Sequence, residues 1–174
     1  ISKISYTFLV TSMQPASGSI MGGTTLAFAG QGFGNCSGME VEMGPDYVCA
    51  ITSCSNDQFD CLTERKAREH VITNGGRHPE LGMGYAWDRT ELEVQPGDTV
   101  RWQWNLLVSG DNIGINIHQT SGGSNEWDRK GFTSGAKKLS GEFQHTFDIL
   151  GTYHYASVPV DNKDLILKGR VVVS

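Results

Sequence analysis

The sequence predicts an all-β protein built from two successive β-sandwich domains, and three observations support that fold class. The 22 glycines are scattered through turn-like positions along the 174 residues. Valine, threonine and aromatic residues fall in short alternating runs, which is the pattern of half-buried strands. No stretch keeps a helical period with capping residues over three turns. Only "CLTERKAREHV" (61–71) has room for one or two helical turns, and we expect it to be a connector.

The composition is that of a globular protein. Apolar residues make up 38% and charged residues 19% of the chain, and the formal net charge is −5. There is no basic run that would bind nucleic acid. The longest apolar stretches, "ISYTFLV" and "LILKGRVVV", are far shorter than the roughly 20 residues that span a bilayer. We therefore expect a soluble chain without membrane contact. Because it starts at Ile1 without a methionine or signal peptide, we also expect a piece of a longer protein.

The first ten residues, "ISKISYTFLV", alternate like a strand and precede the first turn signals. Ile4, Tyr6 and Phe8 share one face of such a strand, and an isolated strand is not stable in water. We expect residues 1–10 to come from, or to serve, a neighbouring module by adding to a sheet edge, first of all that of a segment ending like "LKGRVVVS". Contacts of this kind build tandem arrays, or a filament when the contact does not close.

The next elements, over 11–67, carry all the cysteines and one glycosylation signal. No C-x-x-C pair and no histidine lies among the cysteines, so two disulfides are favoured over a zinc site, with three pairings open. Disulfides imply an oxidising compartment. Asn35 begins the sequon "NCS" in a glycine-rich loop where a glycan would be accessible, which favours a secreted or cell-surface glycoprotein. The four cysteines are Cys36, Cys49, Cys54 and Cys61.

The opening of this region, "MQPASGSIMGGTTLAFAGQGFG", places a Pro-x-Ser-Gly turn, a Gly-Gly turn and a strand before "GQGFG". It resembles the start of the TIG domain, an immunoglobulin-like module, and "VEMGPDYVCAI" and "FDCLT" resemble the paired strands whose cysteines join in that family. The resemblance implies a bridge from Cys49 to Cys61 and leaves Cys36 to pair with Cys54. This TIG segment is short at its C-terminal end.

Residues 68–174 continue with strands separated by tight turns. "PGDTV" delivers a strand that ends in Trp102 and Trp104, and "GEFQHTFDILGTYHYAS" puts Tyr153 and Tyr155 on one strand face. These residues resemble the cupredoxin fold, a Greek-key β-sandwich that holds copper in its best-known members. A type-1 copper site needs a thiolate, two imidazoles and a weak axial ligand.

The ligand positions implied by the cupredoxin resemblance carry no ligands here. Ala156 stands where the thiolate should be, the second histidine would fall near Pro159 or Val160, and the axial methionine near 165–167. Without a thiolate there is no blue-copper centre, whatever His118 does. We expect no metal and no cofactor. The five histidines lie far apart in sequence, and His145 is expected to be a hydrogen-bonded core residue on an aromatic strand face.

Catalytic signatures are missing as well. The loop aspartates are solvated turn residues by default, and no G-x-S-x-G elbow occurs. Trp127 in "SNEWDRKG" is the best surface candidate for binding a sugar, whereas Trp102 and Trp104 are expected in the core. We therefore predict that the chain is not an enzyme.

A TIG segment followed by a copperless cupredoxin-like segment resembles the extracellular region of the fibrocystin family over nearly the whole chain. That resemblance implies a structural or adhesive surface scaffold, and its expected partners are copies of itself, neighbouring modules of the same protein and glycans. Two rival functions remain open: a metal-binding or redox cupredoxin, and a carbohydrate-binding module.

Overall fold

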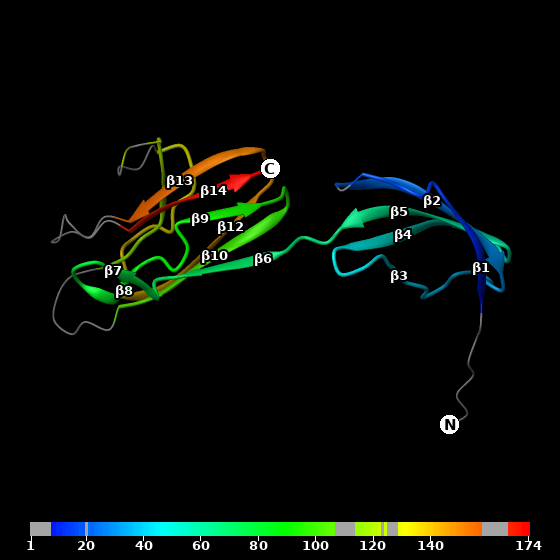
Figure 1. Cartoon of the computed structure of the whole chain (residues 1–174), viewed down its shortest axis with the longest axis horizontal. Coiled ribbons are helices and arrows are strands. Elements are labelled where there is room, and N and C mark those ends of the chain that lie inside the picture. Colours follow the sequence, from blue (N-terminus) through cyan, green and yellow to red (C-terminus); the bar gives the residue numbers. More distant parts are fainter. Residues whose placement is uncertain (1–7, 20, 107–113, 123, 125–128, 158–166) are drawn as a thin grey trace, which may run out of the picture. The chain divides into compact units, whose positions relative to one another are not determined.

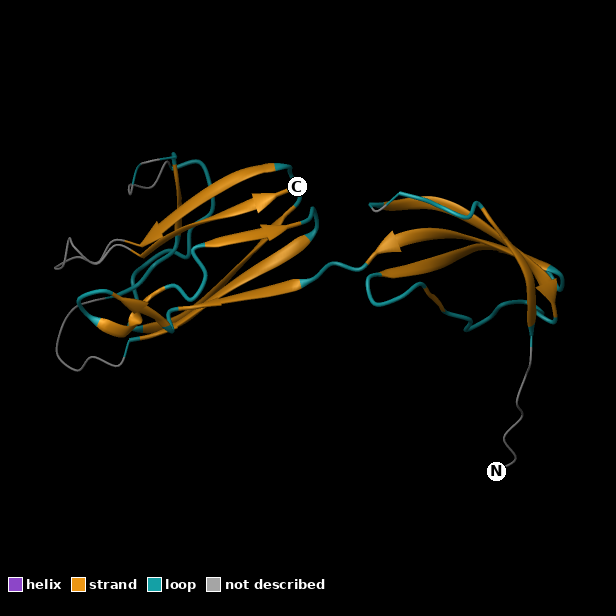
Figure 2. Cartoon of the chain, viewed as in Figure 1, coloured by secondary structure: helices purple, strands orange, loops and turns teal. Residues whose placement is uncertain are grey.

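The computed structural model describes residues 8–19, 21–106, 114–122, 124, 129–157 and 167–174. The chain divides into two compact units, Ile1–Lys66 and Ala67–Ser174, which we describe separately (Figure 1). All regular structure among the described residues is β, and no helix occurs there (Figure 2). The all-β fold class expected from the sequence is confirmed.

The first unit is one antiparallel sheet of five strands. Its strands pair in the order β1-β2-β5-β4-β3, so β1 and β3 form the two edges. The bounds are β1 Leu9–Gln14, β2 Gly22–Gln31, β3 Val41–Glu42, β4 Tyr47–Cys54 and β5 Gln58–Arg65.

One face of this sheet carries the core of the first unit. The rings of Phe28 and Phe59 stack with their centroids 4.6 Å apart, and Phe33 meets Phe59 edge-on at 4.9 Å. Partly buried side chains of the segment after β2, Met39 and Met43 among them, pack against this cluster. The other face of the sheet is exposed, because successive side chains of a strand point to opposite faces. Thr25, next to the buried Leu26, is an exposed residue of that face.

The second unit is a β-sandwich of two facing sheets and a small hairpin. One sheet has the order β12-β10-β6 and the other β11-β13-β14-β9. The parallel pairs β6 with β10 and β9 with β14 join strands that are distant in sequence, as Greek-key connections require. The bounds are β6 Glu69–Thr73, β7 Gly76–His78, β8 Gly82–Ala86, β9 Glu91–Val94, β10 Asp98–Asn105, β11 His118–Thr120, β12 Ser140–Phe147, β13 Gly151–Ser157 and β14 Leu167–Val173.

Trp102 lies at the centre of the second core. Its side chain is fully buried, and its ring centroid lies 5.1 Å from that of Tyr155 on the opposite sheet and 5.8 Å from that of Phe143 on β12. Burial strongly raises the pKa of the Tyr155 hydroxyl, which therefore stays protonated. Trp102 and Trp104 are both core residues because alternate positions of β10 face the sandwich interior.

The turn from β9 to β10 leads from one sheet to the other. Its residue Asp98 also holds the backbone at Arg68, near the start of the second unit. Gln95 to Asp98 form a turn closed by an Asp98 N–H to Gln95 carbonyl bond of 3.0 Å, with Gly97 at φ 88°, as a type II turn demands. The buried Asp98 carboxylate accepts the backbone N–H groups of Arg68 at 2.8 Å and of Gln95 at 3.1 Å. It also lies 3.1 Å from Nε2 of His70.

Two sequence-based expectations are corrected here. The stretch 61–71 contains no helical turn, because its two halves belong to β5 and β6 and pair with other strands. The expected segment 1–10 is not separate from the first domain at its end: Leu9 pairs with Gln31 and Val10 with Gly30, so β1 belongs to the first sheet. Ile4 and Tyr6 lie outside the described residues.

Docking of residues 1–10 on a sheet edge of a cupredoxin-like segment ending like "LKGRVVVS" stays a prediction, and the structure shows only how that last strand is paired within this chain. The segment "LKGRVVVS" forms β14, which pairs with β13 along its whole length and with β9 over Arg170–Val173. A strand hydrogen-bonded on both sides has no free edge for another strand. Strand addition to this sheet would therefore use an edge other than Arg170–Val173, because β11 and β9 form the outer strands of the sheet.

Candidate functional site

The position expected to hold the copper thiolate is apolar and buried. Ala156 on β13 is 1% exposed and lies directly opposite the buried His118 on β11. The strands therefore bring His118 to the place where the missing thiol would stand, and a methyl group replaces the thiol. Pro159, Val160 and residues 165–166 lie outside the described residues, and Leu167 begins β14 as a buried core residue.

The histidines outside that position have structural surroundings of their own. Nε2 of His70 faces Asp98, and Nδ1 of His78 accepts the backbone N–H groups of Glu80 and Leu81 at 3.3 and 3.2 Å. Among the described residues, no group of three or more His, Cys, Asp or Glu side chains is placed to hold a metal ion. No pattern in the sequence indicates the His70 and Asp98 pair, because the two residues meet only when β6 runs beside β10.

His145 forms part of an aromatic groove on the second unit. Its ring lies 4.7 Å from Phe132 and 4.8 Å from Phe147, centroid to centroid, and it is half-buried. Burial lowers the pKa of His145, and the charge of Asp148 opposes this in part. Gln119, Lys130 and Gln144 add polar side chains to the same groove. The groove thus combines buried aromatic rings with polar side chains at the surface. Trp127, the sugar-binding candidate from the sequence, lies outside the described residues.

Both disulfides lie in the first unit, with the pairing that the TIG resemblance implies. Cys49 on β4 is joined to Cys61 on β5 with a Cα–Cα distance of 5.3 Å, and both are buried in the core. Cys36, in the loop after β2, is joined to Cys54 at the end of β4 with a Cα–Cα distance of 6.1 Å. The second bridge ties the loop that covers the core face to the sheet beneath it.

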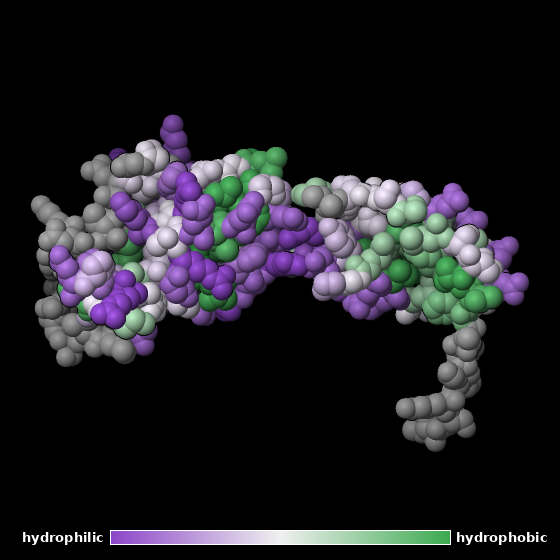
Figure 3. All heavy atoms as spheres, in the orientation of Figure 1, coloured by the Kyte–Doolittle hydropathy of each residue, from purple (hydrophilic) through white to green (hydrophobic). Residues whose placement is uncertain are grey.

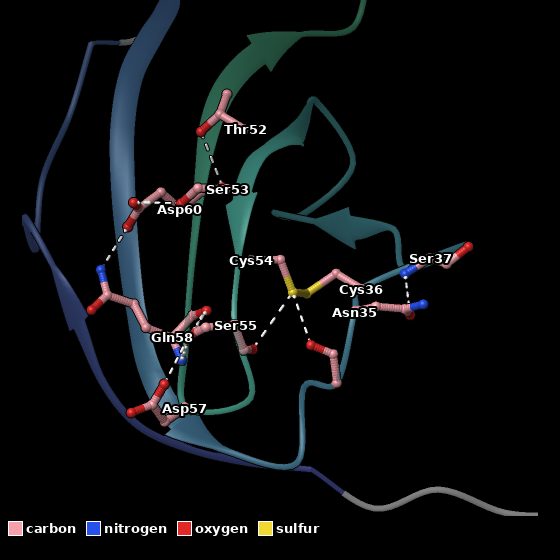
Figure 4. The surroundings of a disulfide bond; sticks show 11 residues. Asn35, Cys36, Ser37, Thr52, Ser53, Cys54, Ser55, Asp57, Gln58 and Asp60 are labelled. Carbon is pink, nitrogen blue, oxygen red and sulfur yellow. Dashed lines mark hydrogen bonds between the residues drawn. A yellow bond between two sulfur atoms is a disulfide. The ribbon is translucent and has the colours of Figure 1, made fainter.

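The sequon residue stands in that tied loop. Figure 4 shows Asn35 and Ser37 on either side of Cys36, with the bridge to Cys54 anchoring the loop. Asn35 is exposed, and its Oδ1 accepts the Ser37 backbone N–H at 3.1 Å. The site is therefore accessible and held in a defined turn.

An exposed apolar row along β1 is the feature that sequence reasoning only partly anticipated. Phe8, expected as an assembly residue, is 51% exposed and touches Phe33 with a centroid distance of 5.8 Å. Leu9, Val10 and Met13 are also exposed, by 60%, 42% and 39%. Figure 3 shows hydrophobic residues gathered on the first unit where β1 begins. Contiguous apolar patches of this kind mark contact surfaces.

Comparison with known proteins shows what the chain is similar to. The sequence matches the IPT/TIG domain over residues 9–78. It is 36% identical over 173 residues to fibrocystin-L from Homo sapiens and 37% identical over 174 residues to fibrocystin-L from Mus musculus, in each case over 98% of this chain. The expected resemblance to the fibrocystin family is confirmed. The chain spans only 4% of the length of either fibrocystin-L protein.

Two solved structures are similar to about three fifths of the chain. A purple cupredoxin from Nitrosopumilus maritimus is 24% identical, covers 63% of this chain and 100% of its own, and superposes with a TM-score of 0.41. A pseudoazurin from Sinorhizobium is 23% identical over 62% of this chain and 74% of its own, with a TM-score of 0.39.

Together, the TIG match, the two disulfides and the similarity to fibrocystin-L identify an extracellular-type module. None of the described segments forms a helix that would reach across a bilayer.

Proposed function

We propose that this fibrocystin-L-like segment is a non-enzymatic structural module of a cell-surface coat or filament, which associates end to end with neighbouring modules or with further copies of itself. The observation that carries the proposal is the apolar row of Phe8, Leu9, Val10 and Met13, which the first unit leaves 39% to 60% exposed.

Strand addition gives this row a mechanism of association. β1 is an edge strand, and an edge presents backbone N–H and C=O groups to another strand. Residues 1–7 precede β1 and carry the alternating apolar residues Ile4 and Tyr6, which would need an apolar surface if the segment added as a strand. A donor segment and an acceptor edge on one chain make a heterologous contact, which repeats along an axis when it does not close.

The disulfides and the sequon fit this role at a cell surface. Two bridges stabilise a small unit against unfolding outside the cell, where chaperones are scarce, and a glycan on Asn35 would shield the loop between β2 and β3. Adhesion then rests on protein surface and glycan contacts and requires no reaction.

The proposal is tested by comparing the chain 1–174 with a chain that begins at residue 8. Light scattering coupled to size exclusion, over a range of protein concentrations, should show concentration-dependent association for the first and a monomer for the second. A chain carrying Ile4→Ser and Tyr6→Ser is the matched control for length and should also remain monomeric. Unchanged association after the deletion would refute the assembly mechanism.

A second candidate function, carbohydrate binding, is favoured by the aromatic groove at Phe132 and His145. Titration calorimetry with a panel of oligosaccharides tests it, with His145→Ala as the variant that should lose the binding. A metal or redox role is tested by adding Cu(II), and the alanine at position 156 leads us to expect no intense visible band.

A further inference from the structure

The core face of the first unit is open at the end where β1 stops. A cavity of about 230 Å³ lies there, and its lining is mainly apolar. Leu26 and Thr63 form its floor on the sheet, Met13 and the turn 15–19 form one wall, and Met43 and Tyr47 form the other. The two walls belong to the β1 edge and to the segment that follows β3, so the groove opens between the two edges of the sheet.

Two residues of the apolar row, Val10 and Met13, lie on the same face as this groove, whereas Leu9 points to the opposite face. Met13 lies opposite Phe28 and Val10 opposite Gly30 in the β1 to β2 register, and directly opposed residues share a face of the sheet. Phe28 belongs to the core, so Met13 and Val10 point to the core side. They nevertheless remain 39% and 42% exposed, because nothing in the described part of the unit covers them.

The family match indicates which part of the family pattern the first unit lacks. The TIG pattern extends over residues 9–78, but the first unit ends at Lys66. The remaining residues of the pattern form β6 and β7, which pair with β10 and β8 of the second unit. The first unit therefore lacks a length of chain that the family pattern includes, and the second unit uses that length as strand.

Residues 1–7 have the size and chemistry to fill this gap. Seven extended residues reach about 23 Å, longer than an average strand. In an extended strand, Ile4 and Tyr6 would fall on one face and Ser5 and Thr7 on the other, a pattern that suits a strand with one buried side.

Residues 1–7 of the same chain are badly placed to fill the cavity of their own first unit. β1 begins at Leu9 beside Gln31, whereas the cavity lies near Met13, at the far end of β1. To reach it, the chain would have to reverse direction within residues 1–10, and these contain no Gly, Pro, Asn or Asp, the residues that favour tight turns. The geometry points to residues 1–7 of a second copy as the strand that completes the core face of the first unit.

This inference rests on the proposed function and names the acceptor site of the proposed assembly. A fluorescein-labelled peptide of residues 1–8 is titrated into the chain that begins at residue 8, and binding is followed by fluorescence anisotropy. We expect saturable binding. Met13→Asp and Met43→Asp should each weaken it at least tenfold, because a carboxylate would be buried beneath the bound strand.

The matched control is Thr25→Asp, which places the same charge next to Leu26 but on the opposite, exposed face of β2, and should leave binding unchanged. Circular dichroism verifies that all three variants are folded. A peptide with Ile4→Ser and Tyr6→Ser should not bind.

The outcomes separate the two proposals. One outcome is that deletion of residues 1–7 abolishes association of the intact chain while the peptide binds the Met13→Asp and wild-type chains equally well. In that case the acceptor groove is wrong and strand-mediated assembly stands. An intact chain that stays monomeric although the deleted chain binds the peptide would show that the segment fills its own groove, which overturns a second copy as occupant. If the deletion leaves association unchanged and the peptide does not bind, both proposals are overturned.

Discussion

Removing the buried disulfide of the first unit should cost more stability than removing the half-exposed one. The perturbation is Cys49→Ala with Cys61→Ala, and the matched control is Cys36→Ala with Cys54→Ala. The bridges close loops with sequence separations of 12 and 18, for which chain entropy alone gives about 3 kcal/mol each. Loop length therefore does not distinguish the two variants.

Burial does distinguish them. Cys49 and Cys61 are 4% and 0% exposed within the core, whereas Cys36 and Cys54 are half-buried. Truncating two core sulfurs adds about 1 to 2 kcal/mol of lost contact and cavity. We expect a total loss of about 4 to 5 kcal/mol for the first variant and about 3 kcal/mol for the control. A unit of this size has roughly 3 to 9 kcal/mol of stability in all, so the first variant should lose a large share of it.

The distribution of tryptophan makes the assay specific to each unit. All four tryptophans lie beyond Lys66, so fluorescence in a urea titration reports the second unit alone, and far-ultraviolet circular dichroism reports both. The fluorescence midpoint should be the same in all three proteins, while the transition of the first unit moves to lower urea. Equal losses in the two variants would refute the role given to sulfur burial, and a shifted fluorescence midpoint would refute independent unfolding of the units.

Three further predictions concern single residues. Because burial lowers the pKa of His145 below its ordinary 6.5, the histidine takes up a proton in the unfolded chain before it does so in the folded one as the pH falls. The second unit should therefore keep its full stability above about pH 6.5 and lose part of it below. In urea titrations at different pH values, His145→Gln should make that loss smaller. Asp98→Ala should destabilise the second unit by about 2 kcal/mol or more, since two backbone N–H groups lose their acceptor, with Asp98→Asn clearly milder; equal effects would contradict this. Secretion from eukaryotic cells should give a glycan on Asn35 that Asn35→Gln removes, and intact mass spectrometry without any glycan on the unaltered protein would disprove it.

Local patterns allowed much of the fold to be predicted. The "PGD" turn and the alternation through Trp102 and Trp104 are short-range signals, and the structure places both where the pattern predicts. The missing thiolate at Ala156 is a single-residue fact that needs no structure. Alternation also marked Phe8 as apolar on a strand face, but it continues into Val10 without a break, so it could not show where the first sheet begins.

Long-range pairing was beyond the reach of the sequence. β14 and β9 pair in parallel although Arg170 and Glu91 are far apart along the chain. No local sequence pattern therefore shows that β14 has a partner on that side. The charged stretch 61–71 has good helix formers, but pairing with β2, β4 and β10 overrides that preference. The open groove likewise depends on which strands end up at the edges, and periodicity carries no information about sheet order.

The position of β14 between two strands has a mechanical consequence. Force transmitted along the polypeptide through Val173 pulls on a strand that is hydrogen-bonded to β13 on one side and to β9 on the other. Tension along the strand axis loads both ladders in shear, so many bonds must break together before the strand slides. We therefore expect the second unit to resist tension applied along this strand.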